Sequence, residues 1–338
     1  MLAYAYSLYF VCFMAYFATI LVSMNDRIKL GISSCLLGEK VRYDGGHKLD
    51  NYLKGTLGQF VDWVHVCPEV ESGLSVPREP MRLVGSTENP RLIKSRSGID
   101  YTDHMFKWAE KRLDGVELED LCGFIFKSKS PSSGLRDVRV YSQAGIMSRA
   151  GTGIFAKAFM EKFPYIPVED DGRLCAPDLR ENFIERVFVF KRWKEFKKKG
   201  GVKDLIEFHT DHKLLILAHS TIHYSDLGSI VSNAKNYQSE VLHEEYLKLL
   251  MEGLSLIATI RKNTNVLHHM IGYFKKQLHP DEKQELTEII NNYHSGHVPL
   301  IVPITLLKHY VRKYNEPYLK RQHYLDPHPL ELRLRNHA

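Results

Sequence analysis

Residues 28–46 read IKLGISSCLLGEKVRYDGG, and this stretch decides the class of the first half of the chain. Ile28 to Ser33 is a short apolar run that ends in small residues, which is typical of a buried strand. Cys35 and a polar turn rich in glycine follow it directly. Loops that leave a rigid strand often carry binding and catalytic residues. The stretch therefore predicts a buried strand whose carboxyl end carries a candidate site.

Further strands and helices alternate along the rest of the first half. We expect helices at Leu53–Trp63, Asp103–Leu113 and Gly153–Phe163, and strands at Val64–Val66, Cys122–Phe126 and Tyr165–Val168. This alternation is typical of an α/β domain with a mostly parallel, Rossmann-like sheet. In such a sheet the functional site is expected at the carboxyl ends of the strands.

The pattern becomes helical after about Phe183. Amphipathic helices are expected at Ile184–Lys199, Leu205–Ala218, Ser239–Thr259, Leu267–Gln277 and Pro280–Tyr293. The run His297–Thr305 contains two prolines, so we expect an ordered loop or bend there instead of one regular helix. The turn KKKGG at 197–201 ends the first of these helices. It marks a boundary between an α/β domain at 24–199 and an all-α domain at 200–338.

The bulk properties agree with two domains and give a cellular expectation. A chain of 338 residues exceeds the usual size of one hydrophobic core. Five cysteines are an odd number in a large chain, which excludes a disulfide framework and favours reduced thiols in the cytoplasm. Residues 1–23 are apolar and uncharged, and Met24 offers a second start. We favour a mis-assigned start; the alternative is a membrane anchor, and a membrane partner is expected only then.

Three loops at predicted strand ends carry the candidate chemistry. They are SSCLLG at 33–38 with VRYDGG at 41–46, CPEV at 67–70 with Pro77 and Arg78, and KSKSPSSG at 127–134. Their glycines, prolines and serines expose backbone N–H groups and side-chain oxygens toward a common pocket. One at a time these are weak signals, because Cys35 and Cys67 equally suit small buried hydrophobic positions.

Taken together and in order, the three motifs resemble the thiouracil desulfidase family, from about Ile28 to Asp171. The second half contains EFHTDHKLLILAHS at 207–220, NVLHHMIGYFKK at 265–276 and VPLIVPITLLKHY at 298–310. These segments resemble the YbgA helical domain. The combination looks like the long-form desulfidases that remove sulfur from 4-thiouridine in transfer RNA.

The resemblance implies a non-redox desulfuration that depends on a [4Fe–4S] cluster. Family members hold the cluster with three cysteine thiolates, and its open iron accepts the substrate sulfur. Carried over to this chain, the resemblance makes Cys35 and Cys67 cluster ligands and Glu69 the general acid and base. Ser130 and, after it, Ser132 are the expected polar helpers.

The third cluster ligand departs from the family pattern. Many members have a cysteine where this chain has Ser133. Cys122 is the remaining thiol near the same loop, so we take it as the third ligand, with Ser133 as the alternative. A cysteine packed in its strand explains Cys122 equally well. If neither residue binds iron, the chain is an RNA-binding protein with a degenerate cluster site.

Substrate and partner expectations follow from charge. Arg42, Asp44 and Arg78 are expected either to fix a loop or to bind a nucleotide phosphate. Basic clusters interleaved with aromatic residues in the helical half suit transfer RNA, and a solvated helical surface would look the same. DNA is not an expected partner. The alternative enzyme is a desulfidase of free thiouracil or thionucleosides. The sequence gives no oligomeric state.

Overall fold

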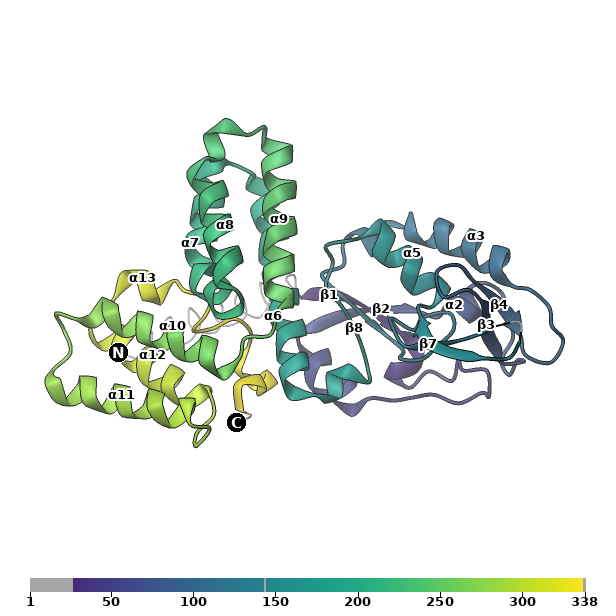
Figure 1. Ribbon diagram of the computed structural model, residues 1–338, viewed down its shortest axis with the longest axis horizontal. Helices are drawn as coiled ribbons and strands as arrows, with labels where there is room; N and C mark the ends of the chain where they lie inside the picture. The colour runs from purple at the N-terminus through teal and green to yellow at the C-terminus, as the bar shows by residue number, and fades with distance from the viewer. Residues whose placement is uncertain (1–26, 143, 337–338) are drawn as a thin grey trace, which may run out of the picture.

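The chain folds into an α/β half followed by an all-helical half, as the sequence predicts (Figure 1). The computed structural model describes residues 27–142 and 144–336, so the apolar run at 1–23 lies outside the described residues. Within those residues, no helix combines the length and apolarity that spanning a bilayer requires.

Four parallel strands form the first sheet, sheet A, in the order β2-β1-β5-β8. Their bounds are β1 Ile28–Ser33, β2 Val61–Val66, β5 Phe124–Phe126 and β8 Val168–Asp170. Ser33 pairs with Val66, so β1 and β2 end at the same level. The helix expected at Leu53–Trp63 is confirmed only in its first part, as a π-helix at Tyr52–Thr56 and a 3₁₀ helix at Leu57–Gln59. Its end is wrong, because β2 already begins at Val61.

The second sheet, sheet B, contains both parallel and antiparallel pairs and was not predicted from the sequence. Its order is β4-β3-β6-β7, and the bounds are β3 Met81–Gly85, β4 Pro90–Lys94, β6 Val138–Tyr141 and β7 Met147–Gly151. β3 and β4 form one antiparallel pair, and β6 and β7 form another. The two pairs join where β3 lies parallel to β6. Leu83, Val138 and Val140 turn inward onto a small separate core that includes Met105.

Four helices accompany the sheets of this half. They are α2 Pro68–Glu71, α3 Thr102–Leu113, α4 Val116–Glu119 and α5 Ile154–Lys162. The expected helices at Asp103–Leu113 and Gly153–Phe163 are confirmed as α3 and α5. Phe159 of α5 lies 4.9 Å from the ring of Phe124, so α5 packs directly on sheet A. Aromatic stacking of this kind contributes about 0.5–1.5 kcal/mol per pair beyond area burial.

The helical half contains the remaining helices. They are α6 Pro177–Lys199, α7 Val202–His219, α8 Thr221–Ser232, α9 Ser239–Ser255, α10 Ile260–Ile271, α11 Pro280–His294, α12 Ile301–Lys313 and α13 Pro317–Lys320. The expectation of a loop throughout His297–Thr305 is wrong, because α12 begins at Ile301. Pro303 lies in the first turn of α12. Backbone N–H groups of the first turn have no hydrogen-bond partner within the helix, so a proline is tolerated there.

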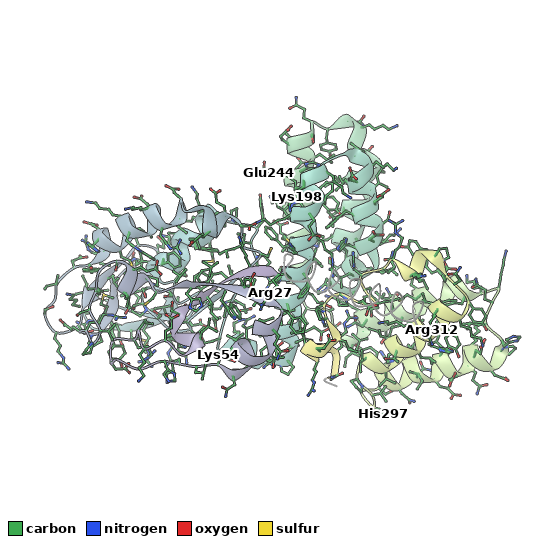
Figure 2. The ribbon with its side chains drawn as sticks, turned by 180° about the vertical axis from the view of Figure 1, so that it is seen from behind. Arg27, Lys54, Lys198, Glu244, His297 and Arg312 are labelled. Atoms are coloured by element: carbon green, nitrogen blue, oxygen red, sulfur yellow. The ribbon has the colours of Figure 1, made fainter. Side chains whose placement is uncertain are left out.

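Helix α6 lies between the two halves and packs on both. A Cβ on Gly123 would stand 2.8 Å from Val187 Cγ2, so α6 approaches sheet A as closely as glycine allows. On its other side Trp193 stacks on Tyr246 of α9, with ring centroids 5.5 Å apart. Figure 2 shows the α/β half, labelled at Lys54, and the helices labelled at Arg312 on opposite sides of this junction. One hydrophobic core therefore runs through both halves.

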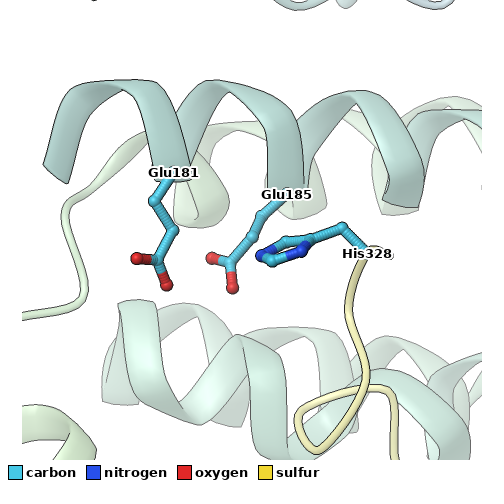
Figure 3. A group of neighbouring side chains, drawn as sticks. All are labelled: Glu181, Glu185 and His328. Atoms are coloured by element: carbon cyan, nitrogen blue, oxygen red, sulfur yellow. The ribbon is translucent and has the colours of Figure 1, made fainter. Parts of the chain in front are cut away.

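Buried ion pairs tie the end of the chain to α6. Arg335 donates to Glu185 at 2.8 Å and pairs with Glu181 at 3.3 Å, and His219 Nε2 lies 3.1 Å from Glu185. Figure 3 shows the two glutamates and His328 side by side. Burial raises the pKa of Glu181 to about 8. For Glu185 burial acts the same way, but the charge of Arg335 and the His219 hydrogen bond outweigh it and lower the pKa to about 2.

Candidate functional site

The carboxyl ends of β1, β2 and β5 meet around one cavity of about 320 Å³. All three loops singled out in the sequence line it, because parallel strands place their carboxyl ends at the same edge. Of the candidate site residues, the lining includes Cys35, Arg42, Cys67, Glu69, Arg78, Ser130, Ser132 and Ser133. Asp44 and Cys122 are not part of the lining.

Cys35 lies in a 3₁₀ turn, Ser34–Leu37, directly after β1. Gly38 ends this turn with φ of 96°, a left-handed conformation that glycine adopts without steric cost. The Cys35 thiol is buried. Burial raises the pKa of Cys35 to about 11, and the positive charge of Lys127 opposes this shift. Without a bound cation this thiol stays protonated at neutral pH. Metal binding would therefore displace a proton here.

Cys67 follows β2 and precedes the first turn of α2. Its backbone N–H donates to Glu71 Oε1 at 2.8 Å, which fixes the turn that carries the thiol. Burial also raises the pKa of Cys67, and the neighbouring Cys67 thiol contributes to the raised pKa of Cys35. Both thiols line the same cavity and therefore belong to one site.

Glu69 is held at both carboxylate oxygens. Arg78 donates through Nε to Oε2 at 2.8 Å, and Ser132 Oγ donates to Oε1 at 2.8 Å. Arg78 also donates to the Val41 carbonyl at 2.8 Å, and its side chain is only 5% exposed. Arg78 therefore orients Glu69 and the loop after Cys35. This structural interpretation of Arg78 was one of the alternatives left open by the sequence.

The serine loop extends this hydrogen-bonded chain. Ser130 Oγ lies 3.0 Å from Ser132 Oγ, and Ser133 Oγ lies 3.3 Å from Ser132 Oγ on its other side. The first turn of α5 holds the loop, because Phe155 N donates to the Ser132 carbonyl at 2.9 Å. A Cβ on Gly153 would stand 2.6 Å from the Ser132 backbone, so only glycine allows this approach.

Basic residues surround the thiols, and one was missed by sequence reasoning. Arg42 lines the cavity and lies 3.5 Å from Asp44, whose own side chain is exposed and accepts from Gly46 N. Lys127 was not among the site residues predicted from the sequence, yet it lines the cavity and pairs with Asp171 at 2.8 Å. Its position directly after a buried strand was the available signal.

The structure does not place Cys122, the expected third ligand, in the lining of this cavity. Cys122 precedes β5, and its N–H donates to the carbonyl of Lys29 near the start of β1. The chain is extended from Lys29 to Ser33, which corresponds to about 13 Å, and Cys35 lies beyond that in the turn Ser34–Leu37. The sequence reasoning overlooked strand direction, since Cys35 and Cys67 follow their strands whereas Cys122 precedes its own. Cys175 follows β8 but is exposed and does not line the cavity.

The donors that line the cavity include the two thiols, the Glu69 carboxylate and several serine hydroxyls, those of Ser130, Ser132 and Ser133 among them. Ser133 is buried and lines the same cavity as Cys35 and Cys67. Within the described ranges, no third cysteine lines it. This set fits an iron–sulfur cluster with two thiolates if an oxygen donor such as the expected alternative, Ser133, serves as third ligand. The nearby cations Lys127 and Arg42 suit a site that carries thiolate charge.

The fold and pocket define a two-part protein: an α/β domain with two cysteines lining a cavity at its strand ends, continued by a helical domain. The family described as 2-thiouracil desulfurase matches residues 30–171, and the one described as "Protein of unknown function (DUF1722)" matches residues 213–329. The chain belongs to the 2-thiouracil desulfurase family through its first half and to the YbgA family through its second.

Individual relatives match one half each. The uncharacterized protein YbgA of Escherichia coli (strain K12) is 32% identical over 158 residues, which cover 46% of this chain and 94% of that protein. The uncharacterized protein YbbK of Bacillus subtilis (strain 168) is 33% identical over 108 residues, which cover 30% of this chain and 71% of the relative. A solved structure described as a [4Fe-4S]-dependent thiouracil desulfidase, TudS, is 29% identical with a TM-score of 0.36, covering 44% of this chain and 94% of that one.

Proposed function

We propose that this protein is an iron–sulfur-dependent, non-redox desulfidase that acts on a thiolated uridine, with 4-thiouridine in transfer RNA as the preferred substrate. One observation carries the proposal: Cys35 and Cys67 line the same cavity as the hydrogen-bonded pair Glu69 and Ser132. Membership of the desulfurase family supports C–S cleavage. The reaction exchanges the ring sulfur for the oxygen of water, C=S + H₂O → C=O + H₂S, so no electron donor is needed.

Cys35, Cys67 and the hydroxyl of Ser133 would hold a [4Fe–4S] cluster. When bound, such a cluster supplies an open iron, which is a soft Lewis acid suited to sulfur. Two thiolates and one serine oxygen give the three protein ligands that leave this position free. Cys35 and Ser133 are buried and Cys67 is partly buried, which supports the assignment because partial exclusion of water strengthens bonds to charged ligands.

Glu69 is the residue that moves protons in this proposal. Arg78 fixes its Oε2 atom, while Oε1 accepts from Ser132 at 2.8 Å. The carboxylate takes a proton from the attacking water and later returns it to the departing sulfur, as a general base and then an acid. Ser130, 3.0 Å from Ser132, continues the chain of hydroxyls that orients this water.

The substrate can be a nucleotide in RNA or a free base. The cavity of about 320 Å³ is at the small end of the range for ligand sites. This volume suits a single pyrimidine ring, so free thiouracil is a second candidate substrate. For RNA, the thiolated base would have to leave the stack to enter the cavity. The exposed lysines 197–199 at the end of α6 support RNA contact by the helical half.

The first test is the iron content of protein reconstituted anaerobically. We expect about four irons per chain, as a [4Fe–4S] cluster requires, with loss in Cys35→Ala and Cys67→Ala. Cys122→Ala is the matched control, because that buried thiol lies at the other end of sheet A and its loss should leave the iron in place. Absence of iron in the wild-type chain would favour the RNA-binding protein with a degenerate cluster site.

The second test compares substrates. Sulfide release from 4-thiouridine-containing transfer RNA is measured beside release from free thiouracil, at equal protein and iron concentrations. Faster release from the RNA supports the preferred substrate. Release from thiouracil alone would assign the protein to the free base, and the helical half would then serve another partner.

A further inference from the structure

A second cavity opens beside the cysteine pocket, on the exposed face of sheet B. Its volume is about 610 Å³, and it shares Lys129 and Pro131 with the lining of the cysteine pocket. The other charged residues that line it are Arg82, Arg139, Arg149 and Asp137. We name the four cations of this cavity the basic groove. With one carboxylate against four cations, the groove has an excess of positive charge.

Strand pairing places the arginines of the basic groove next to one another. Leu83 pairs with Val140 in the parallel register of β3 and β6, which sets Arg82 beside Arg139. Arg149 follows Ser148, the partner of Val140 on β7. Because Leu83 and Val140 face the core, the alternation of a strand turns Arg82 and Arg139 to the opposite, exposed face.

These arginines lack the partners that other arginines of the α/β half have. Residues 27–173 contain eleven arginines, and seven of them pair with carboxylates. The remaining four are Arg82, Arg96, Arg139 and Arg149, and three of these line the basic groove. Like charges on neighbouring strands destabilise a sheet. An anion that neutralises them would remove this cost.

We propose, resting on the desulfidase function above, that the basic groove binds the RNA phosphates beside the thiolated nucleotide. Adjacent strands are about 4.8 Å apart, so three arginines on three strands span about 10 Å, enough for successive backbone phosphates. The arginine fork binds phosphate oxygens through paired hydrogen bonds. Tyr141 supports Arg82, whose guanidinium carbon lies 5.6 Å from the ring centroid.

The lining that the cysteine pocket and the basic groove share supports a nucleic acid as the ligand. A base in the cysteine pocket carries its own phosphates, and Lys129 and Pro131 line both that pocket and the groove. Lys129 makes no hydrogen bond or ion pair with any other residue in the described ranges and is exposed. It is therefore free to contact the phosphate nearest the reacting base. The groove lies in the α/β half, at the other end of the molecule from α10, α11 and α12 (Figure 1).

The test measures binding of a fluorescent, 4-thiouridine-containing RNA hairpin by anisotropy over a series of salt concentrations. The full chain is compared with the triple variant R82A/R139A/R149A. We expect weaker binding and a slope of log K against log salt that is smaller by about 2 to 3, since each lost phosphate contact removes about 0.7–0.9. The variant R82K/R139K/R149K should keep most of the slope, because lysine retains the charge.

Arg96→Ala is the matched control, since Arg96 is exposed and unpaired but lies outside the groove. KM for free thiouracil should stay unchanged in the triple variant while KM for thiolated RNA rises. Equal RNA binding by the wild type and the triple variant would overturn the assignment. So would a triple variant that keeps RNA binding but loses binding to anionic phosphatidylglycerol vesicles. The binding assay does not require turnover. If the protein released no sulfide but its RNA affinity still depended on the groove, the desulfidase function would be refuted and the groove assignment would stand.

Discussion

Each half of the molecule has a glutamate–arginine pair that is largely removed from solvent, and these two pairs differ in what surrounds them. In the α/β half Glu69 pairs with Arg78, and the glutamate side chain is 16% exposed on a cavity. In the helical half Glu185 pairs with Arg335, and the glutamate is 3% exposed. Arg335 and His219 contact the two carboxylate oxygens of Glu185.

The difference teaches how the same ion pair can serve chemistry or stability. The Glu69 carboxylate is held from one side and meets a chain of serine hydroxyls on the other, so a proton can arrive and leave. Glu185 also lines a cavity, of about 480 Å³, but Arg335 and His219 contact both of its carboxylate oxygens and no chain of hydroxyls meets it among the described residues. A buried pair of the second kind stabilises mainly because removing either partner leaves an uncompensated charge. Variants at the two sites should therefore fail in different ways.

The largest expected effect is on catalysis at Glu69. Glu69→Gln keeps the shape and the Ser132 contact but cannot take a proton, so kcat for sulfide release should fall by about 10²–10⁴-fold. The iron content and Tm should remain near those of the wild type. Glu117→Gln, on an exposed glutamate of the same half, is the control and should leave kcat unchanged. Activity of Glu69→Gln within tenfold of wild type would remove Glu69 from the proton path.

Glu185→Ala should act on stability alone. The substitution leaves Arg335 buried without this carboxylate partner, and we expect the free energy of unfolding to fall by about 3–5 kcal/mol. Denaturant titration measures the loss, and kcat per folded molecule should persist. Glu195→Ala on the same helix removes a half-exposed pair with Lys191 and should cost below about 0.5 kcal/mol. Equal losses in both variants would show that the buried pair does not anchor the end of the chain.

Gly153→Ala should disturb the serine loop. Its new Cβ would press on the Ser132 backbone at 2.6 Å, costing about 1–3 kcal/mol of stability and lowering kcat. Gly228→Ala in α8 is the matched control, since nothing lies within 4 Å of its added Cβ. That change should stabilise the helix by about 0.5–1 kcal/mol. Thermal unfolding of both variants distinguishes steric pressure from a general effect of the substitution.

The smallest expected effect is a pH slope that comes from Glu181. Its pKa is raised from 4.5 to about 8, so the folded state keeps a proton that the unfolded state has released. The free energy of unfolding should therefore fall as pH rises from about 5 through 8. The lowered pKa of Glu185 acts only below about pH 4.5, outside this window. Glu181→Gln should flatten the fall of Tm between pH 6 and pH 8; an unchanged slope would contradict the assignment.

Sequence reasoning reached the fold class and the convergence of the three loops, because parallel strands leave little choice about where their ends meet. The cysteine pair, Glu69 and the serines accordingly line one cavity. Cys122 failed for the same physical reason, since a residue before a strand lies at the other edge. The chemical roles of the site residues stay predictions, because contact alone does not test reactivity.

Sheet B and the start of α12 lay beyond the sequence patterns. β3 and β6 pair across more than 50 residues of chain, and short strands of four or five residues carry little periodicity of their own. The basic groove depends on that pairing, so its three arginines look unrelated in the sequence. Pro303 misled the helix prediction because a proline in the first turn is tolerated, whereas one further along is not.

Helix α6 sets a limit on how this chain can be divided. Val187 packs against sheet A at Gly123, while Trp193 packs within the helical half, so α6 completes both cores. A recombinant fragment cut at residue 200 would expose the face that carries Trp193, and a cut before Pro177 would uncover sheet A. Either fragment would be prone to aggregate unless the uncovered apolar side chains were replaced by polar ones. Engineering an isolated desulfidase module thus requires redesign of a surface, not only a choice of end points.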